Sequence, residues 1–312
     1  MAAVGEILAF GRTSLRKESE HPARDAVLLL ALALDKPPEY PYLHPEDAVT
    51  EAQAAGYRRL IERRRTGEPV AYLRGYQEFM GLRFLVDRRV LIPRPETEKL
   101  VEAALAASGR TEDVRLGRGG GTDSGSSRAL GIADMCCGCG AIGLTLAKML
   151  PRAFVALADL SSGALAVARE NATSLGVLER VRFYEGDLAQ PLVEAGLSGG
   201  FDVLVSNPPY IPEEDMDALP RDVRCFEPRL ALDGGPGGLG VIRRMAAETP
   251  GLLRPGGHAF IEIGDGQGES CAGLFSSVPG WQDFRVIPDY SGRQRVFAAR
   301  RVGGHADQGR NS

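Results

Sequence analysis

Apolar residues follow a helical repeat through the first part of the chain, up to about Arg65. Segments 24–32 and 52–61 place apolar side chains three and four positions apart, which is the spacing of one helical face. Pro37 and Pro38 interrupt the repeat, because proline lacks a backbone donor and ends a helix. The pattern therefore predicts a small bundle of helices.

Further along the chain, short apolar runs alternate with helical segments. Five runs have the length and composition of buried strands: 130–134, 154–158, 181–184, 201–205 and 259–263. The apolar segment 141–150 predicts a helix directly after the first run. Alternating strands and helices favour a sheet with helices on its faces, so the sequence predicts an α/β fold. Two later runs, 283–287 and 295–298, predict a terminal hairpin.

The run at 201–205 is followed at once by 206–210, which reads Ser-Asn-Pro-Pro-Tyr. The two prolines end the strand, because neither donates a ladder hydrogen bond and each fixes φ. The segment predicts a rigid elbow at the carboxyl end of a strand, where open α/β sheets bind ligands. There the Asn207 amide, main-chain carbonyls and the Tyr210 ring can hold a planar amino group. An ordinary structural turn is the alternative.

A glycine-bearing turn at 135–140 joins the first predicted strand to the helix at 141–150. Strand, turn and helix are typical of a nucleotide-binding βαβ unit, whose glycines let the backbone approach a ligand. The spacing is not that of a dinucleotide-binding loop, and no phosphate-loop lysine follows. Asp159, at the end of the second strand, can accept hydrogen bonds from both ribose hydroxyls. These features alone leave the nucleoside open.

Together the turn, the acidic strand end and the elbow resemble class I S-adenosylmethionine-dependent methyltransferases. The resemblance implies a Rossmann-like, doubly wound, mostly parallel sheet of seven strands with an antiparallel terminal strand. It implies that S-adenosylmethionine is bound by Asp134, Cys136, Cys137, Gly138, Cys139, Gly140, Asp159, Asp187, Leu188 and Asn207. Cys136 departs from the family pattern, which has glycine there, and cysteine tolerates φ above zero poorly.

Five further segments resemble the release-factor glutamine methyltransferase family, also called the HemK/PrmC type. They follow in the family's order at 67–75, 78–84, 91–98, 222–224 and 226–228. The likeness extends from about residue 20 to about residue 300. It implies methylation of a glutamine side-chain amide nitrogen, N5, within the Gly-Gly-Gln motif of class 1 peptide release factors.

The same resemblance assigns catalytic roles to Asn207, Pro208 and Tyr210, and substrate binding to these three together with Pro209. The Asn207 side-chain oxygen and the Pro208 carbonyl would accept the two hydrogens of the substrate amide. Tyr210 would pack on the plane of that amide. The enzyme is then an S-adenosylmethionine-dependent protein-glutamine N5-methyltransferase that acts in translation termination.

The chain is predicted to contain a helical substrate-recognition domain at 1–78, a β-hairpin linker at 79–95 and a methyltransferase domain at 96–303. Segment 109–128 is rich in Gly, Ser and charge without apolar periodicity, which predicts a flexible insertion. Residues 304–312 are polar and predict a disordered tail.

Composition narrows the class of protein and its surroundings. A net charge of −4 argues against nucleic-acid phosphate as the main partner. No run approaches the roughly 20 apolar residues that span a bilayer, and the N-terminus lacks a secretory pattern. Five cysteines, three of them in one turn, fit a reducing cytoplasm better than a disulfide framework. We expect a cytoplasmic monomer with no membrane association and no stable binding to nucleic acid.

The cluster of Cys136, Cys137 and Cys139 raises the possibility of a metal site. Structural zinc needs a second ligand pair at a defined distance, and none follows, so no metal is expected. The alternative is a redox-sensitive thiol, because a helix N-terminus lowers the pKa of a nearby cysteine.

Three rival functions stay open at this point. A related enzyme modifies glutamine in a ribosomal protein and would carry a similar elbow. An N6-adenine nucleic-acid methyltransferase also uses this elbow, although it should bring a basic groove. A non-catalytic module that only binds S-adenosylmethionine would fit the altered Cys136.

Overall fold

The computed structural model describes residues 2–108 and 128–303. The predicted tail at 304–312 lies outside the described residues, and so does the predicted insertion at 109–128 apart from Arg128. The chain divides into two compact units. The first comprises Met1–Gln77, Val86–Arg88 and Ala218–Glu227, and the second comprises Glu78–Leu85, Arg89–Asp217 and Pro228–Ser312. The domain boundaries expected from the sequence stay a prediction.

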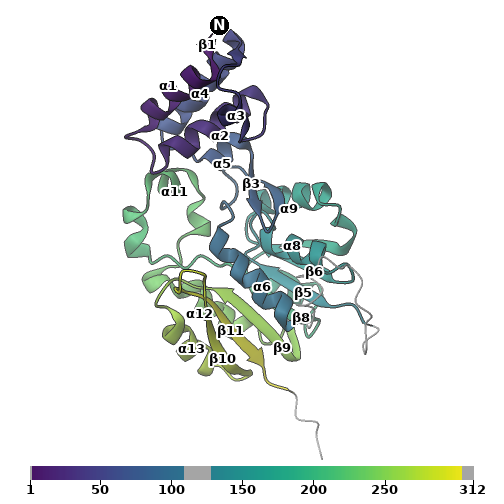
Figure 1. Cartoon of the computed structure of the whole chain (residues 1–312). Coiled ribbons are helices and arrows are strands. Elements are labelled where there is room, and N and C mark those ends of the chain that lie inside the picture. Colours follow the sequence, from purple (N-terminus) through teal and green to yellow (C-terminus); the bar gives the residue numbers. More distant parts are fainter. Residues whose placement is uncertain (1, 109–127, 304–312) are drawn as a thin grey trace, which may run out of the picture. The chain divides into compact units, whose positions relative to one another are not determined.

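The first unit is helical, as the sequence predicts (Figure 1). Its helices are α1 (Val4–Leu15), α2 (Pro22–Leu34), α3 (Tyr40–Leu43), α4 (Glu51–Arg65), α5 (Val70–Arg74) and α11 (Arg221–Phe226). Short strands β1 (Ala2–Ala3) and β2 (Ala48–Val49) pair beside them. Leu15, Leu29, Tyr57 and Ile61, from α1, α2 and α4, lie fully buried in one apolar core. Because these helices bury one apolar face each, packing rather than propensity holds them.

The second unit contains a seven-stranded sheet in the order β10-β11-β9-β8-β5-β6-β7 (Figure 1). Its strands are β5 (Gly131–Met135), β6 (Phe154–Asp159), β7 (Val181–Glu185), β8 (Phe201–Ser206), β9 (Leu253–Glu262), β10 (Trp281–Pro288) and β11 (Gln294–Arg301). The five strands from β9 to β7 pair in parallel, whereas β11 runs antiparallel to both β9 and β10. The predicted doubly wound sheet with an antiparallel terminal strand is confirmed.

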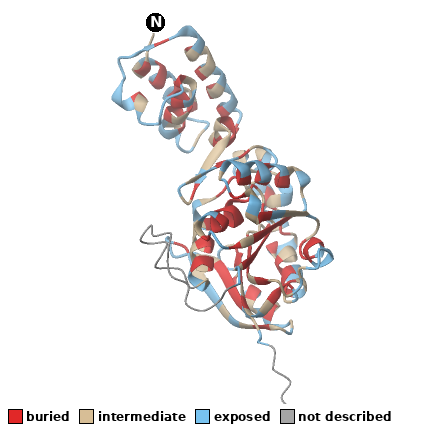
Figure 2. Ribbon diagram, turned by 90° about the vertical axis from the view of Figure 1, so that its right-hand side faces the viewer, coloured by how far each residue is buried: buried red, intermediate tan, exposed pale blue. Residues whose placement is uncertain are grey.

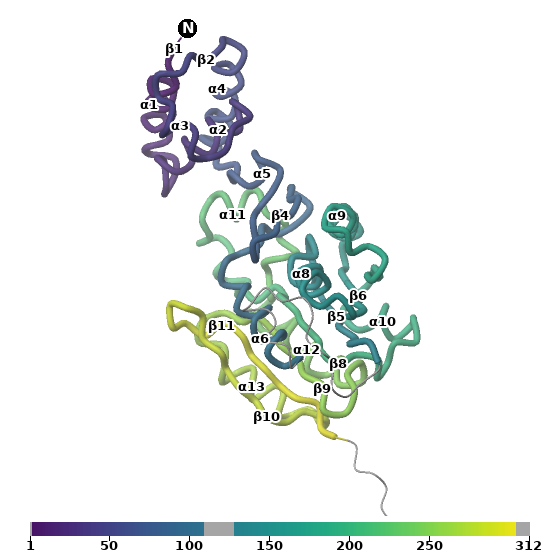
Figure 3. The backbone as a smooth tube through the Cα atoms, turned by 45° about the vertical axis from the view of Figure 1, so that its right-hand side comes forward, coloured from purple at the N-terminus to yellow at the C-terminus, as the bar shows by residue number. Residues whose placement is uncertain are grey.

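Helices cover both faces of this sheet. They are α6 (Glu98–Ala107), α8 (Ala141–Met149), α9 (Ser162–Ser174), α10 (Gln190–Glu194), α12 (Gly240–Glu248) and α13 (Gly268–Ser276). Ala133 and Met135 of β5 share a buried cluster with Met245 of α12. The intervening Asp134 faces α8 instead and accepts a hydrogen bond from the Gly143 N–H (2.8 Å). Successive strand side chains point to opposite faces, so α8 and α12 cover different faces; Figure 3 shows α8 beside β5 and β6.

The central strands are the most deeply buried part of the second unit (Figure 2). Every residue of β5 is buried, and so are most residues of β6 and β8. Parallel strands covered on both faces carry continuous apolar runs, which explains why the sequence shows no alternation there. Within residues 2–108 and 128–303, no helix is long and apolar enough to cross a bilayer.

A hairpin is formed by β3 (Tyr76–Phe79) and β4 (Leu82–Leu85). Its two turn residues, Met80 and Gly81, have φ values of 51° and 70°. Positive φ at both positions is the geometry of a type I′ turn, which matches the twist of paired strands. The segment predicted as a hairpin linker, 79–95, therefore includes β4 but only the last residue of β3.

Asn171 of α9 ties the hairpin to the glycine-bearing turn. This side chain is fully buried. Its Oδ1 accepts a hydrogen bond from the Leu85 N–H (2.7 Å), and its Nδ2 donates to the carbonyls of Leu85 and Cys139 (3.0 Å each). One amide therefore satisfies three backbone groups, two of them on the hairpin and one on the turn.

We expect Asn171→Ala to lower the free energy of unfolding by about 2–3 kcal/mol, because it leaves buried backbone groups without partners. Chemical denaturation measures the change. Thr173→Ala is the control on the same helix, because Thr173 is exposed, and its effect should stay within about 0.5 kcal/mol. Equal stabilities of the two variants would show that the Asn171 amide is not needed.

Candidate active site

A cavity of about 290 Å³ opens at the carboxyl ends of β5, β6, β7 and β8. Parallel strands bring these ends to one edge of the sheet, where doubly wound folds bind their ligands. Nine of the residues proposed from the sequence line it: Cys136, Cys137, Gly138, Cys139, Asp159, Asp187, Leu188, Asn207 and Pro209. Four others proposed from the sequence, Asp134, Gly140, Pro208 and Tyr210, are not part of the lining.

The turn after β5 winds through three residues with positive φ. These are Cys136 (55°), Gly138 (55°) and Gly140 (81°), the last of which is the N-cap of α8. The Gly140 N–H closes the turn on the Cys137 carbonyl (2.8 Å). The turn thus keeps a left-handed corner at Cys136, where a residue with Cβ is strained by about 1–2 kcal/mol.

Asp159 connects the end of β6 to this turn. Its Oδ2 accepts the Gly138 N–H (2.8 Å), and its Oδ1 accepts the Ser161 N–H (2.9 Å). Burial raises the pKa of Asp159, while the hydrogen bonds from these backbone groups oppose the rise. The carboxylate therefore both holds the turn and forms part of the cavity wall.

Asp134 lies behind the turn rather than on the cavity wall. Its side chain is completely buried, and its Oδ2 accepts the Gly143 N–H (2.8 Å) at the start of α8. Its Oδ1 has no hydrogen-bond partner among the described residues. Burial raises the pKa of this carboxyl to about 8. Gly143 has no room for a side chain here, since a Cβ would lie 2.4 Å from Leu157 Cδ2 and 2.8 Å from Asp134 Oδ2.

The three cysteines of the turn contradict the prediction of a thiol with lowered pKa. Burial raises the pKa of Cys136 and Cys139 to about 12, and that of Cys137 rises well above its usual range. The negative charge of Asp159 adds to the rise at each of them. The prediction was wrong because burial outweighs the helix N-terminus. In the part of the chain that the structure describes, no cluster of His, Cys, Asp or Glu is arranged to hold a metal ion.

The elbow after β8 places Asn207 at the cavity. Its Nδ2 donates a long hydrogen bond to Thr97 Oγ1 (3.4 Å), and its Oδ1 accepts none from the described residues. Ser206 anchors the end of the strand by donating its hydroxyl to the Met135 carbonyl (2.7 Å). The Asn207 oxygen is therefore the polar atom that the elbow offers to a ligand.

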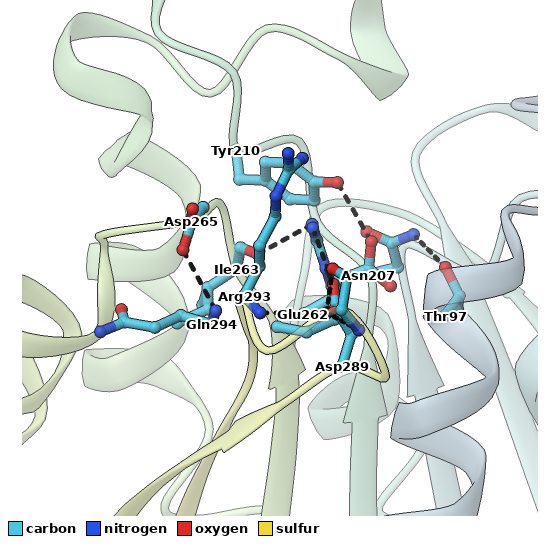
Figure 4. A network of polar contacts seen from close by, with 11 residues as sticks. Thr97, Asn207, Tyr210, Glu262, Ile263, Asp265, Asp289, Arg293 and Gln294 are labelled. Carbon is cyan, nitrogen blue, oxygen red and sulfur yellow. Dashed lines mark hydrogen bonds and ion pairs between the residues drawn. The ribbon is translucent and has the colours of Figure 1, made fainter.

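Tyr210 belongs to a polar network beside the elbow (Figure 4). Its hydroxyl donates to Glu262 Oε1 (3.1 Å), and its carbonyl accepts from Gln267 Nε2 (3.0 Å). Burial raises the pKa of Tyr210, and the charge of Glu262 adds to the rise.

Thr97, Glu262 and Gln267 belong to the site although sequence reasoning did not assign them a role. Thr97 lines the cavity, and the other two hold the elbow. The sequence could have indicated Glu262, because it is a charged residue inside the apolar run 259–263.

Two family models match the chain: the PrmC N-terminal domain over residues 6–75 and the methyltransferase small domain over residues 125–221. The release factor glutamine methyltransferase of Moorella thermoacetica is 44% identical over 284 residues, covering 90% of this chain and 92% of that protein. The one from Geobacter sulfurreducens is 37% identical over 300 residues, covering 95% and 96%. The crystal structure of the hMettl16 catalytic domain in complex with MAT2A 3'UTR hairpin 6 has a TM-score of 0.54 at 12% identity, covering 89% and 93%, and supports the fold alone.

The sheet, the turn after β5 and the relatives together define a class I methyltransferase that depends on S-adenosylmethionine. Within that class, the chain belongs to the release factor glutamine methyltransferase family. The family resemblance carried by the sequence motifs is thereby confirmed.

The left-handed corner gives a prediction about stability. Cys136→Gly and Cys136→Ala both remove the thiol, but only glycine removes the strain at φ 55°. We expect the glycine variant to be more stable than the alanine variant by about 1 kcal/mol. Thermal unfolding of both proteins measures the difference, and an alanine variant of equal or greater stability would show that the corner is unstrained.

Proposed function

We propose that this protein transfers the methyl group of S-adenosylmethionine to N5 of the glutamine in the Gly-Gly-Gln motif of class 1 release factors. The observation that carries the proposal is Asn207 at the cavity, with Nδ2 held by Thr97 and Oδ1 left as the acceptor. The relatives named above are release factor glutamine methyltransferases, so glutamine in a ribosomal protein and adenine in nucleic acid are not favoured.

The described residues fit the cofactor. It carries a ribose diol, an adenine ring and a charged amino-acid end, and it supplies an electrophilic methyl group on a sulfonium. Asp159 offers carboxylate oxygens at the cavity wall for the diol, and Leu160 and Leu188 offer apolar surface for a flat ring. A cavity of about 290 Å³ lies just below the usual range for small-ligand sites, about 300–1,000 Å³.

On this proposal the elbow orients the substrate amide. The Asn207 oxygen and the Pro208 carbonyl accept its two hydrogens and direct the nitrogen lone pair into the cavity. An amide nitrogen is a poor nucleophile, so alignment carries much of the rate, up to about 7–11 kcal/mol in favourable cases. The same acceptors stabilise the positive charge that develops on nitrogen. Tyr210 also helps to hold the elbow, because its hydroxyl donates to Glu262 Oε1.

We also propose that the protein acts in the cytoplasm as a monomer. All five cysteines are free thiols, which is the state that a reducing compartment maintains.

Asp159→Ala is expected to weaken S-adenosylmethionine binding by about 1.5–3 kcal/mol, because it removes charged acceptors for the ribose hydroxyls. Isothermal titration calorimetry measures the affinity. Circular dichroism is run alongside, since Asp159 also holds Gly138 and Ser161. A folded variant with wild-type affinity would exclude the ribose role.

Asn207→Ala should lower kcat by about 10²–10³-fold, because it removes a preorganised acceptor at the transition state. The Michaelis constant for the release factor should change much less. Asn207→Asp is the matched variant: it keeps an acceptor but loses the donor to Thr97 and adds a charge. If Asn207→Ala has the kcat and Michaelis constant of the wild type, the elbow does not orient the substrate amide.

The function itself is tested by incubating the protein with a purified class 1 release factor and isotopically labelled S-adenosylmethionine. Mass spectrometry of the Gly-Gly-Gln peptide should find one added methyl group, on the glutamine. A release factor with glutamate in place of that glutamine is the control. Cofactor binding without any transfer would instead support a non-catalytic binding module.

A further inference from the structure

We infer that Glu262 is a positioning residue, which acts through Thr97 and Tyr210 to fix the orientation in which Asn207 presents its amide oxygen. The inference rests on the proposed function for its kinetic consequences, but its structural content concerns only the side chains of this chain.

The strand register places Glu262 beside the elbow. β8 and β9 pair in parallel, and Ser206 lies opposite Ile261. The residues that follow them, Asn207 and Glu262, are therefore neighbours at the carboxyl ends of the two strands. Glu262 is only 1% exposed. A buried carboxylate without hydrogen bonds is costly, so its partners decide what it does.

One oxygen of this carboxylate has a partner, and the other has none of standard geometry. Oε1 accepts the Tyr210 hydroxyl (3.1 Å), while Oε2 is buried and unpaired among the described residues. The Thr97 hydroxyl lies close enough to lower the pKa of Glu262. Oε2 is thus left as an acceptor that no other described group uses; Figure 4 shows the two printed contacts on either side of it, Tyr210 with Glu262 and Asn207 with Thr97.

The Thr97 hydroxyl carries a single proton, which sets the orientation of the Asn207 amide. When Thr97 Oγ1 accepts Nδ2 of Asn207 (3.4 Å), its own proton must point elsewhere. We assign Glu262 Oε2 as that acceptor, because it is buried and has no other partner among the described residues. The relay runs from the Asn207 amide to the Thr97 hydroxyl to the Glu262 carboxylate, and it keeps Oδ1 of Asn207 toward the cavity. If the Asn207 amide were flipped, its NH2 group would face the NH2 group of the substrate amide, and two donors cannot form a hydrogen bond.

The relay requires an ionised carboxylate. Burial raises the pKa of Glu262, and the charge of Glu96 adds to the rise. Thr97, Tyr210 and the charge of Arg295 lower it, although Arg295 is also paired with Asp289 (3.3 Å). Protonation of Glu262 removes its negative charge and turns one of its oxygens into a donor, which weakens it as an acceptor for the two hydroxyls. Activity should therefore fall as pH decreases, at a higher pH than an exposed glutamate would give.

The test compares Glu262→Gln with Glu269→Gln, a carboxylate-to-amide change at an exposed position on α13. We expect Glu262→Gln to lower kcat for the release factor about 10²-fold, with little change in the Michaelis constant. Its kcat should also lose the acid limb of the pH profile. Glu269→Gln should match the wild type in both respects.

A second pair of variants addresses the hydroxyl. Thr97→Val removes it at nearly constant volume, whereas Thr97→Ser keeps it. We expect the valine variant to lose kcat as Glu262→Gln does and the serine variant to retain it. Glu262→Gln and Thr97→Val interrupt the same relay. The double variant should therefore lose no more kcat than the more impaired of the two single variants. Calorimetry of cofactor binding accompanies these measurements, because Thr97 lines the cavity.

A readout without turnover separates this inference from the proposed function. In protein labelled with ¹⁵N-asparagine, the Asn207 amide signals are identified by their absence from Asn207→Ala. Glu262→Gln and Thr97→Val should shift these signals alike, and Thr97→Ser and Glu269→Gln should leave them in place.

The kinetic and NMR results for the Glu262 and Thr97 variants can support or overturn the inference. Wild-type kcat and unshifted amide signals in Glu262→Gln would overturn the inference. If Glu262→Gln does not fold, the valine and serine variants at Thr97 decide it in the same way. Shifted signals in a protein that methylates no release factor would support the relay and reject the proposed function.

Discussion

The site depends on the parallel register of β5, β6 and β8. Parallel pairing brings the carboxyl ends of these strands to one edge, and each strand delivers a different part of the site there. The turn follows β5, Asp159 ends β6, and the elbow follows β8. A shift of the register by one residue would exchange the two faces of a strand. Since both faces are apolar, polar contacts such as that of Asp134 with Gly143 of α8 help to fix which residues face which layer.

Features local in sequence were predictable, and long-range partners were not. The elbow, the turn and Asp159 each follow directly from a strand, so their place at the sheet edge could be inferred. The partnership of Thr97 with Asn207 could not, because 110 residues separate them and only the fold brings them together. Asn171 likewise reaches a hairpin 86 residues away. The hydrogen bond from the Tyr210 hydroxyl to Glu262 was likewise not predictable, because 52 residues separate the two; the packing of the Tyr210 ring on the substrate stays a prediction.

Three buried polar side chains support the turn after β5 and the elbow after β8. Asp134, Asn171 and Glu262 are each almost completely excluded from solvent, and each bonds to the backbone or side chain of a neighbouring element. Such groups are costly to bury, so they are stable only in one arrangement of their partners. They limit the ways in which the turn and the elbow can relax. The hydrogen bonds of these three side chains therefore hold the site together alongside apolar packing.

The cysteines of the turn have a consequence for chemical selectivity. S-adenosylmethionine is an alkylating agent, and thiolates are among the strongest nucleophiles in proteins. With a pKa of about 12, Cys136 and Cys139 are ionised to only about one part in 10⁵ at neutral pH. Burial also raises the pKa of Cys137 well above its usual range. The wall of the cavity therefore carries three sulfur atoms that compete little for the methyl group, because burial and the nearby charge of Asp159 both keep the thiols protonated.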